Sequence, residues 1–208
     1  MSKVTFRVTT LALLAISLAG CATTTFTSTW RDPATPPINP VGKTVCAVFV
    51  SRDESKRRAG EDQLAADLTM HGAKGIPAYT ILPDAMRGDG EAARAAFRAA
   101  GCNGAVTMRV VGKDQVLNYT PGMAMPGPYR GFGPYWGYGW GAAYSPGYLS
   151  TDTIVSVETL VYSLVQDKLL WASTSRTTNP GNLDKLVNEV AVATAKEMQK
   201  QGLLAAQP

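Results

Sequence analysis

The run IVSVETLVYSLV at Ile154–Val165 is the longest strand that the sequence predicts. β-branched and aromatic residues fill the run, which is typical of a β-strand. Successive side chains of a strand point to opposite faces. One face would carry Ile154, Leu160, Tyr162 and Leu164, and the other Val155, Val157, Val161 and Val165. Because both faces are apolar, we expect both to be covered.

A hairpin and a helix are predicted after this strand. Gln166–Lys168 supply a tight turn, and Leu169–Thr174 form the returning strand. Asn179 and Pro180 then open a final helix. Apolar and small residues recur in it at helical spacing and predict the face that packs on the sheet: Leu183, Val187, Val190, Ala191, Thr194 and Met198.

Upstream of the strand at 154–165, three shorter strands alternate with two helices. The strands are expected at Val45–Val50, Ala78–Leu82 and Ala105–Val111, and the helices at 51–70 and Glu91–Ala100. Ser51 and Glu54 form a capping-box signature for the first helix, and Gly72 ends it. The order β-α-β-α-β-(long aromatic loop)-β-β-α predicts an α/β (α+β mixed) domain. It would hold a single mixed sheet of about five strands covered by three helices.

An insertion at 120–148 interrupts this pattern. Gly, Pro and aromatic residues dominate it, and Arg130 is its only charged residue. The candidate partner-binding residues are Tyr135, Trp136, Tyr138 and Trp140, which alternate with glycines. Their rings suit stacking on a glycan such as peptidoglycan, burial against an envelope protein or a second copy, or a place among lipid headgroups. They would equally suit folding back over the sheet as additional core.

The first residues have the layout of a secretory signal, with Lys3 and Arg7 before an apolar stretch at 8–18. This stretch is shorter than the ~20 residues that span a bilayer. It ends in Leu18-Ala19-Gly20-Cys21. Removal of residues 1–20 takes the formal net charge from +4 to +2, because Lys3 and Arg7 leave. A nearly neutral chain offers no electrostatic footprint for nucleic acid, so no nucleic-acid partner is expected.

The four residues Leu18-Ala19-Gly20-Cys21 resemble the lipobox of bacterial lipoproteins. The resemblance implies cleavage before Cys21, a diacylglycerol on its sulfur, and acylation of the new amino terminus by a chain such as palmitate. Several acyl chains give stable membrane anchoring. In lipoproteins of this kind, an aspartate directly after the cysteine favours the inner membrane. Ala22 occupies that position here, so the resemblance implies the periplasmic face of the outer membrane. The predicted domains are then a signal peptide at 1–20, a Thr/Pro-rich tether at 21–41, and a periplasmic domain at 42–204.

Two cysteines remain in the domain, Cys46 and Cys102. The periplasm permits a disulfide between them. Their positions inside and at the start of predicted strands equally suit small, buried, free cysteines.

The sequence offers little support for catalysis. His71 is the only histidine, and its place before Gly72 favours contact with a helix C-terminus over a role as a base. Too few His and Cys residues remain for zinc, and no acidic run fits a calcium loop. We therefore expect no enzyme activity, metal or cofactor. The alternative is a small-molecule-binding or hydrolytic periplasmic enzyme, which a pocket joining Arg109, Tyr162 and Asp152 would favour.

The lipobox, the Thr-rich start, the element order and the aromatic insertion together resemble a family of uncharacterised proteobacterial lipoproteins. The element order is also similar to the periplasmic α/β modules of TolB and CsgG type. The resemblance implies a non-enzymatic binding or assembly module of the cell envelope, anchored by lipid, and it supplies no catalytic residues.

Overall fold

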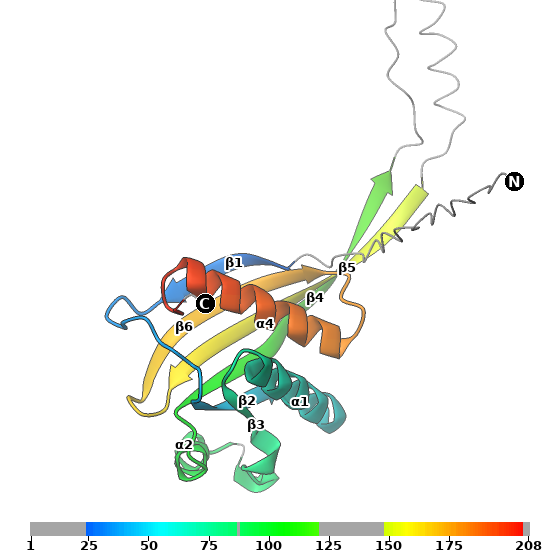
Figure 1. The fold of residues 1–208 in the computed structure, drawn as a ribbon. Helices are drawn as coiled ribbons and strands as arrows, with labels where there is room; N and C mark the ends of the chain where they lie inside the picture. The colour runs from blue at the N-terminus through cyan, green and yellow to red at the C-terminus, as the bar shows by residue number, and fades with distance from the viewer. Residues whose placement is uncertain (1–23, 87, 121–147, 206–208) are drawn as a thin grey trace, which may run out of the picture.

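The computed structural model describes residues 24–86, 88–120 and 148–205. They form one mixed sheet with helices against it, so the predicted fold class is confirmed (Figure 1). The strands are β1 Thr24–Arg31, β2 Thr44–Val50, β3 Lys74–Pro77, β4 Gly104–Thr120, β5 Tyr148–Ser163 and β6 Lys168–Thr178. The helices are α1 Glu54–Met70, α2 Gly90–Ala99 and α4 Leu183–Lys200, with short 3₁₀ turns η1 Ala78–Thr80 and η2 Asp84–Met86.

The six strands lie in the order β1-β6-β5-β4-β2-β3. β2 pairs in parallel with both β3 and β4, because helices long enough to return the chain separate these strands. β4, β5 and β6 pair antiparallel, as does β1 with β6. The sheet is therefore parallel at one end of the strand order and antiparallel at the other.

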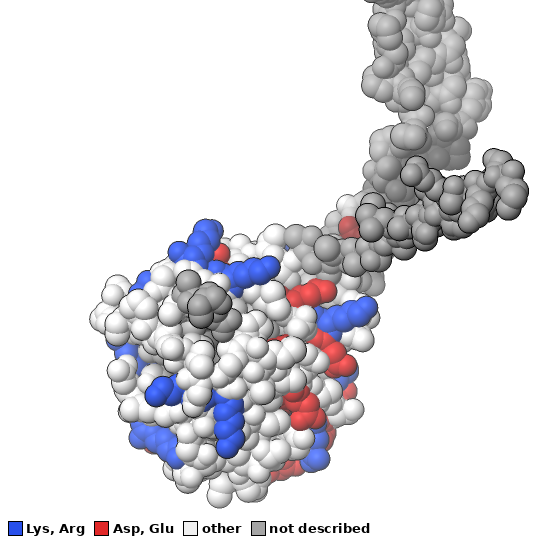
Figure 2. All heavy atoms as spheres, in the orientation of Figure 1, with Lys and Arg blue, Asp and Glu red and all other residues white. Residues whose placement is uncertain are grey.

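Helices α1 and α4 cover one face of the sheet (Figure 1). Val155, Val157 and Val161 point into this layer and are buried, as are Val187 and Val190 of α4. Figure 2 shows this side of the molecule, where charged side chains stand in separate groups around a largely uncharged centre.

The opposite face of the sheet is covered only in part. A smaller core forms there around Phe97 of α2 with Ala105 and Leu164. Ile154 and Leu160, on the same face of β5, are half-buried. The expectation that both faces of the 154–165 run are covered is thus correct for the face with Val155, Val157 and Val161. The opposite face is fully covered only at Leu164, because α2 is too short to span the sheet, and Val165 at the end of the run is exposed.

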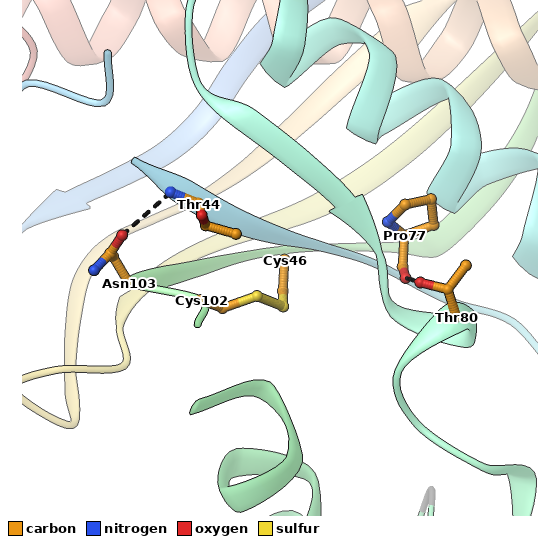
Figure 3. The surroundings of a disulfide bond; sticks show 6 residues. All are labelled: Thr44, Cys46, Pro77, Thr80, Cys102 and Asn103. Atoms are coloured by element: carbon orange, nitrogen blue, oxygen red, sulfur yellow. Dashed lines mark hydrogen bonds between the residues drawn. A yellow bond between two sulfur atoms is a disulfide. The ribbon is translucent and has the colours of Figure 1, made fainter. Parts of the chain in front are cut away.

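Cys46 and Cys102 are joined by a disulfide within this smaller core (Figure 3). The parallel pairing of β2 with β4 sets Cys46 opposite Ala105, which brings the turn before β4 alongside β2. The two Cα atoms are 5.9 Å apart, inside the range that disulfides require. Asn103 strengthens the same junction, since its side-chain oxygen accepts a hydrogen bond of 3.1 Å from the Thr44 amide.

The tether predicted at 21–41 is wrong for Thr24–Arg31, which form the edge strand β1. Threonine is β-branched and favours strands, so a Thr-rich run is ambiguous between a linker and a strand. Phe26 resolves the ambiguity, because its ring packs edge-on against the buried Trp171 with centroids 6.0 Å apart. Trp30 lies opposite Ala172 and is 47% exposed.

The strand predicted at Ala78–Leu82 is displaced. β3 occupies Lys74–Pro77, and Ala78–Thr80 turn into η1. The Thr80 hydroxyl donates to the Pro77 carbonyl at 2.7 Å, which supports the turn over a strand (Figure 3). Gly75 lets β3 approach α1, since a Cβ there would lie 2.1 Å from the Ala65 carbonyl oxygen.

Candidate functional site

Strands β4 and β5 continue well past the ends of their neighbouring strands and form an arm. Pairing of β2 with β4 ends at Arg109, and pairing of β6 with β5 ends at Ile154. Beyond Arg109, β4 pairs only with β5 among the described residues, as far as Thr120 and Tyr148. Residues 115–120 and 148–153 form a ribbon of these two strands alone, because β6 still pairs with β5 from Ile154 onward. Figure 1 shows this two-stranded ribbon projecting away from the body of the domain. We call residues 110–120 and 148–153 the arm.

The arm begins at an irregularity in the pairing of β4 with β5. The register shifts between Val110 and Gly112, so Val111 is an extra residue on β4. Such bulges increase the local twist and redirect the strands that follow. The predicted strand at Ala105–Val111 therefore ends close to where pairing with β2 ends, while the actual strand continues to Thr120 as the arm.

Apolar side chains are exposed on both faces of the arm. Leu117 pairs with Thr151, two positions from Leu149, so these two leucines share a face. Their side chains are 70% and 69% exposed. Tyr148, 65% exposed, lies on the other face with Val116. Neither face is thus a solvated polar surface, which is unusual for a ribbon that extends into solvent.

Polar contacts fix the arm where it leaves the domain. Asp152 accepts hydrogen bonds from the side-chain amides of Asn118 and Asn179. Asn179 also exchanges two hydrogen bonds with the Thr153 backbone, at 2.7 and 2.8 Å. The direction of the arm is therefore set by side chains that follow β6 as well as by the ribbon itself.

A cavity of about 450 Å³ lies between α1 and α4 on the covered face of the sheet. Leu64, Val106, Met108 and Met198 are among its mainly apolar walls. The exposed Lys43 also lines it, so the cavity reaches solvent at the end of the sheet where β4 begins. Its volume lies in the range of small-molecule pockets.

Two polar side chains in the cavity wall are buried, Asp67 of α1 and Thr194 of α4, with 1% and 6% exposure. Asp67 Oδ1 accepts hydrogen bonds from Gln63 at 3.0 Å and from Asn188 at 2.9 Å. Asp67 Oδ2 and Thr194 Oγ1 have no hydrogen-bond partner in the described part of the chain. His71 also lines the cavity, and its Nδ1 contacts the Asp67 carbonyl at 2.7 Å, as expected for a residue at a helix C-terminus.

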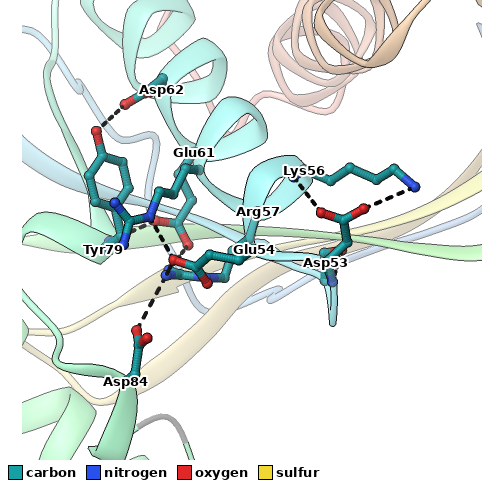
Figure 4. A network of polar contacts seen from close by, with 10 residues as sticks. Asp53, Glu54, Lys56, Arg57, Glu61, Asp62, Tyr79 and Asp84 are labelled. Carbon is teal, nitrogen blue, oxygen red and sulfur yellow. Dashed lines mark hydrogen bonds and ion pairs between the residues drawn. The ribbon is translucent and has the colours of Figure 1, made fainter.

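A polar network joins α1 to the segment after β3 (Figure 4). The buried Arg57 guanidinium donates to Glu54 and Glu61, and the Tyr79 amide donates to Glu61 at 2.6 Å. Burial raises the pKa of the Glu61 carboxyl, against the hydrogen bonds from Tyr79 and Arg57 that lower it. Arg57 also contacts Asp84 at 3.5 Å. These groups satisfy one another and lie outside the cavity wall, so we assign the network to structure.

Arg109, Tyr162 and Asp152, which would favour an enzyme if they lined one pocket, do not lie together. Arg109 forms an ion pair with Glu158 at 2.9 Å, Asp152 lies at the base of the arm, and Tyr162 lines the cavity. In the part of the chain that the structure describes, no group of three or more His, Cys, Asp or Glu side chains could hold a metal ion. Among the same residues, no helix is both long enough and apolar enough to cross a membrane.

Five predicted site residues lie outside the described residues: Cys21, Tyr135, Trp136, Tyr138 and Trp140. Sequence reasoning missed the arm and the cavity. For the cavity a signal was present, because Asp67 interrupts the apolar stripe of Leu64 and Leu68 on α1. For the arm there was none, because 112–118 lack the apolar alternation of a half-buried strand.

No protein-family model matches this chain, and no curated protein matches it. Its fold is similar to that of solved structures. The PelC dodecamer from Paraburkholderia phytofirmans matches in two crystal forms, each with 13% identity and a TM-score of 0.45. These matches cover 90% and 86% of this chain, and 100% and 99% of the other. Lipoprotein GNA1162 from Neisseria meningitidis matches at 13% identity and a TM-score of 0.40, over 76% of this chain and 99% of that one.

Proposed function

We propose that this chain is a lipid-anchored, non-enzymatic lipoprotein of the outer membrane, whose copies assemble in the periplasm by pairing their arms edge to edge. The arm carries this proposal. Its two strands end far beyond the other strands of the sheet. Among the described residues, no strand pairs with the outer edge of β4 beyond Arg109 or with the outer edge of β5 before Ile154, where Thr153 bonds only to Asn179.

An isolated two-stranded ribbon is marginally stable in water. Its unpaired N–H and C=O groups are a template for another strand, and natural edges of this kind are usually short, charged or covered. This arm instead exposes Leu117 and Leu149 on one face and Tyr148 on the other. Such a combination is consistent with a surface that is covered when the protein works.

The start of β1, three residues after the proposed anchor Cys21, lies at the same end of the domain as the arm. Thr24 and Val155 both pair with Thr177, so β1 begins level with the base of the arm. Cys21 precedes Thr24 by three residues, which span at most about 11 Å. The six residues of β5 that precede Ile154, back to Tyr148, extend about 20 Å. A lipid on Cys21 would therefore bring the arm to the membrane surface.

A second copy of this chain fits the arm better than lipid alone. Lipid would cover the apolar side chains but leave the strand edges without hydrogen-bond partners, which is costly away from water. The β4 edge of one arm can pair with the β5 edge of the next, so each copy supplies the partner that its neighbour needs. Such a head-to-tail contact joins several copies into a ring or a chain. Anchoring to one membrane raises the local concentration that favours this pairing.

Crosslinking in intact cells tests the proposal. The full chain should give a ladder of self-crosslinked species, and the double variant Leu117→Asp, Leu149→Asp should lose it. Met70→Asp with Val165→Asp is the matched control, because these side chains are 68% and 69% exposed and lie outside the arm. A ladder that survives in the arm variant, or an adduct with a different protein in place of the ladder, contradicts self-assembly. Circular dichroism shows whether each variant is folded.

The lipid anchor has a separate test. Cys21→Ser should abolish incorporation of labelled palmitate and release the protein from the membrane fraction. Retention of the variant in the washed outer membrane would contradict anchoring through Cys21.

A further inference from the structure

Asp67 and Thr194 line the cavity between α1 and α4, and each has one buried polar atom, Oδ2 and Oγ1, with no hydrogen-bond partner among the residues that the structure describes. More than nine-tenths of such groups in folded proteins have a hydrogen-bond partner. An unpartnered buried acceptor costs about 1–3 kcal/mol, and more when it carries charge. The two atoms belong to different helices, and both residues line the same cavity. We therefore expect a bound molecule in the cavity to supply their missing hydrogen bonds.

Water in this cavity is poorly held. A volume of about 450 Å³ would take many molecules, at roughly 30 Å³ of liquid each. An ordered water needs two to four polar partners, and displacement of poorly ordered water by an apolar group favours binding. Leu64, Val106, Met108 and Met198 provide no such partners. An occupant with an apolar body and very few polar atoms matches these walls.

The polar end of the occupant must donate a hydrogen bond. Asp67 Oδ1 is already used by Gln63 and Asn188, both of which donate, and the free Oδ2 can satisfy one more donor. A hydroxyl or an ammonium group supplies it. A hydroxyl also leaves its oxygen free to accept from Thr194, whose Oγ1 can either donate or accept.

We propose that the cavity is a binding site for a long-chain amphiphile whose hydroxyl or amino group donates to Asp67 Oδ2. The chain would lie along the apolar walls. Lys43 marks the solvent-exposed rim of the site. The site is separate from the arm, so ligand binding and arm pairing can fail independently.

Photolabelling of the full chain in phospholipid nanodiscs tests this site. The probes are 1-dodecanol and 1-aminododecane bearing a diazirine in the chain, and the matching dodecyl methyl ether, which has no donor. Peptides from α1 and α4 that line the cavity should be labelled about tenfold more by at least one donor probe than by the ether, as expected for one strong hydrogen bond. The donor probe that labels more strongly identifies hydroxyl or amine as the preferred group. Labelling elsewhere, or equal labelling by all three probes, would overturn the proposal.

Two matched pairs of variants locate the effect. Ala195 lines the cavity and Ala193 does not, so Ala195→Met should abolish labelling of the cavity walls while Ala193→Met keeps it. Asp67→Asn keeps the shape of the side chain and should reduce the preference for the aminododecane probe over the ether. Thr194→Val provides a second test at nearly constant volume if Ala195→Met is misfolded by circular dichroism. Unchanged labelling in both Asp67→Asn and Thr194→Val would contradict the assignment of the polar end.

Discussion

The side-chain amide of Asn188 on α4 donates a hydrogen bond of 2.9 Å to Asp67 Oδ1 on α1. This bond joins the two helices directly beside the cavity, and its acceptor is 1% exposed. A buried carboxylate is tolerated when donors surround it, so Asn188 supports both the packing of the helices and the position of Asp67.

Asn188→Ala should therefore lower the free energy of unfolding by about 1–2 kcal/mol, since a buried carboxylate loses one of its donors. Urea titration followed by circular dichroism measures the change. The same substitution in an Asp67→Ala background should cost clearly less, because the interaction is already absent. Equal costs in both backgrounds would show that the hydrogen bond does not couple the two helices.

Removal of the disulfide, by Cys46→Ala with Cys102→Ala, should lower the free energy of unfolding by about 2–4 kcal/mol. The bond closes a long loop, since the cysteines are 56 residues apart in sequence. A reductant should destabilise the parent protein and leave the variant unchanged. If the reductant has no effect on the parent, the two thiols are not bonded in the purified protein.

Gly60→Ala should destabilise the domain by about 1–3 kcal/mol through overpacking. A Cβ at Gly60 would lie 2.5 Å from Cγ of Phe49, whose ring is buried between α1 and β2. Gly90→Ala is the matched control, because no atom lies within 4 Å of its added Cβ. Comparison of the two denaturation midpoints measures the effect. A loss at Gly90 as large as that at Gly60 would mean that contact with Phe49 is not the cause.

Acid should remove the contribution of Asp32. Hydrogen bonds from Lys168 and Thr35 lower the pKa of this carboxyl below its ordinary value of 3.8. A lowered folded-state pKa means that the stabilisation is complete above the ordinary value and is lost as the pH falls below it. Asp32→Asn should thus be less stable than the parent at pH 7, and the difference should shrink below about pH 3.8. Thermal melts across this range measure it, and Lys168→Met should show the same trend. A difference that stays constant down to pH 2 would contradict the ion pair.

The central strands were predictable because their sequences contain strong local signals. β2 and β5 each contain three valines, and α4 repeats its apolar residues at helical spacing. These patterns arise from burial against one neighbour and need no knowledge of distant contacts. The alternation in β5 also separated the buried face with Val157 from the half-covered face with Leu160.

The remaining features depend on contacts between distant parts of the chain. The threonines of β1 are compatible with a linker until Phe26 meets Trp171, well over a hundred residues later. The cavity exists only because α1, α4 and the sheet leave space between them. The disulfide needed the parallel register of β2 with β4, which places Cys46 beside the turn at Cys102. None of these arrangements produces a periodic signal in the sequence.

Amide hydrogen exchange of the full chain in outer-membrane vesicles, resolved to single residues, tests pairing of the arms most directly. An isolated ribbon protects alternate amides, because the others point away from the partner strand. Pairing on both edges should protect consecutive amides at 112–118 and 149–152 as strongly as those at 104–109. Leu117→Asp with Leu149→Asp should return the arm alone to the alternate protection of an isolated ribbon. Alternate or absent protection of the arm in the parent protein would contradict edge-to-edge assembly.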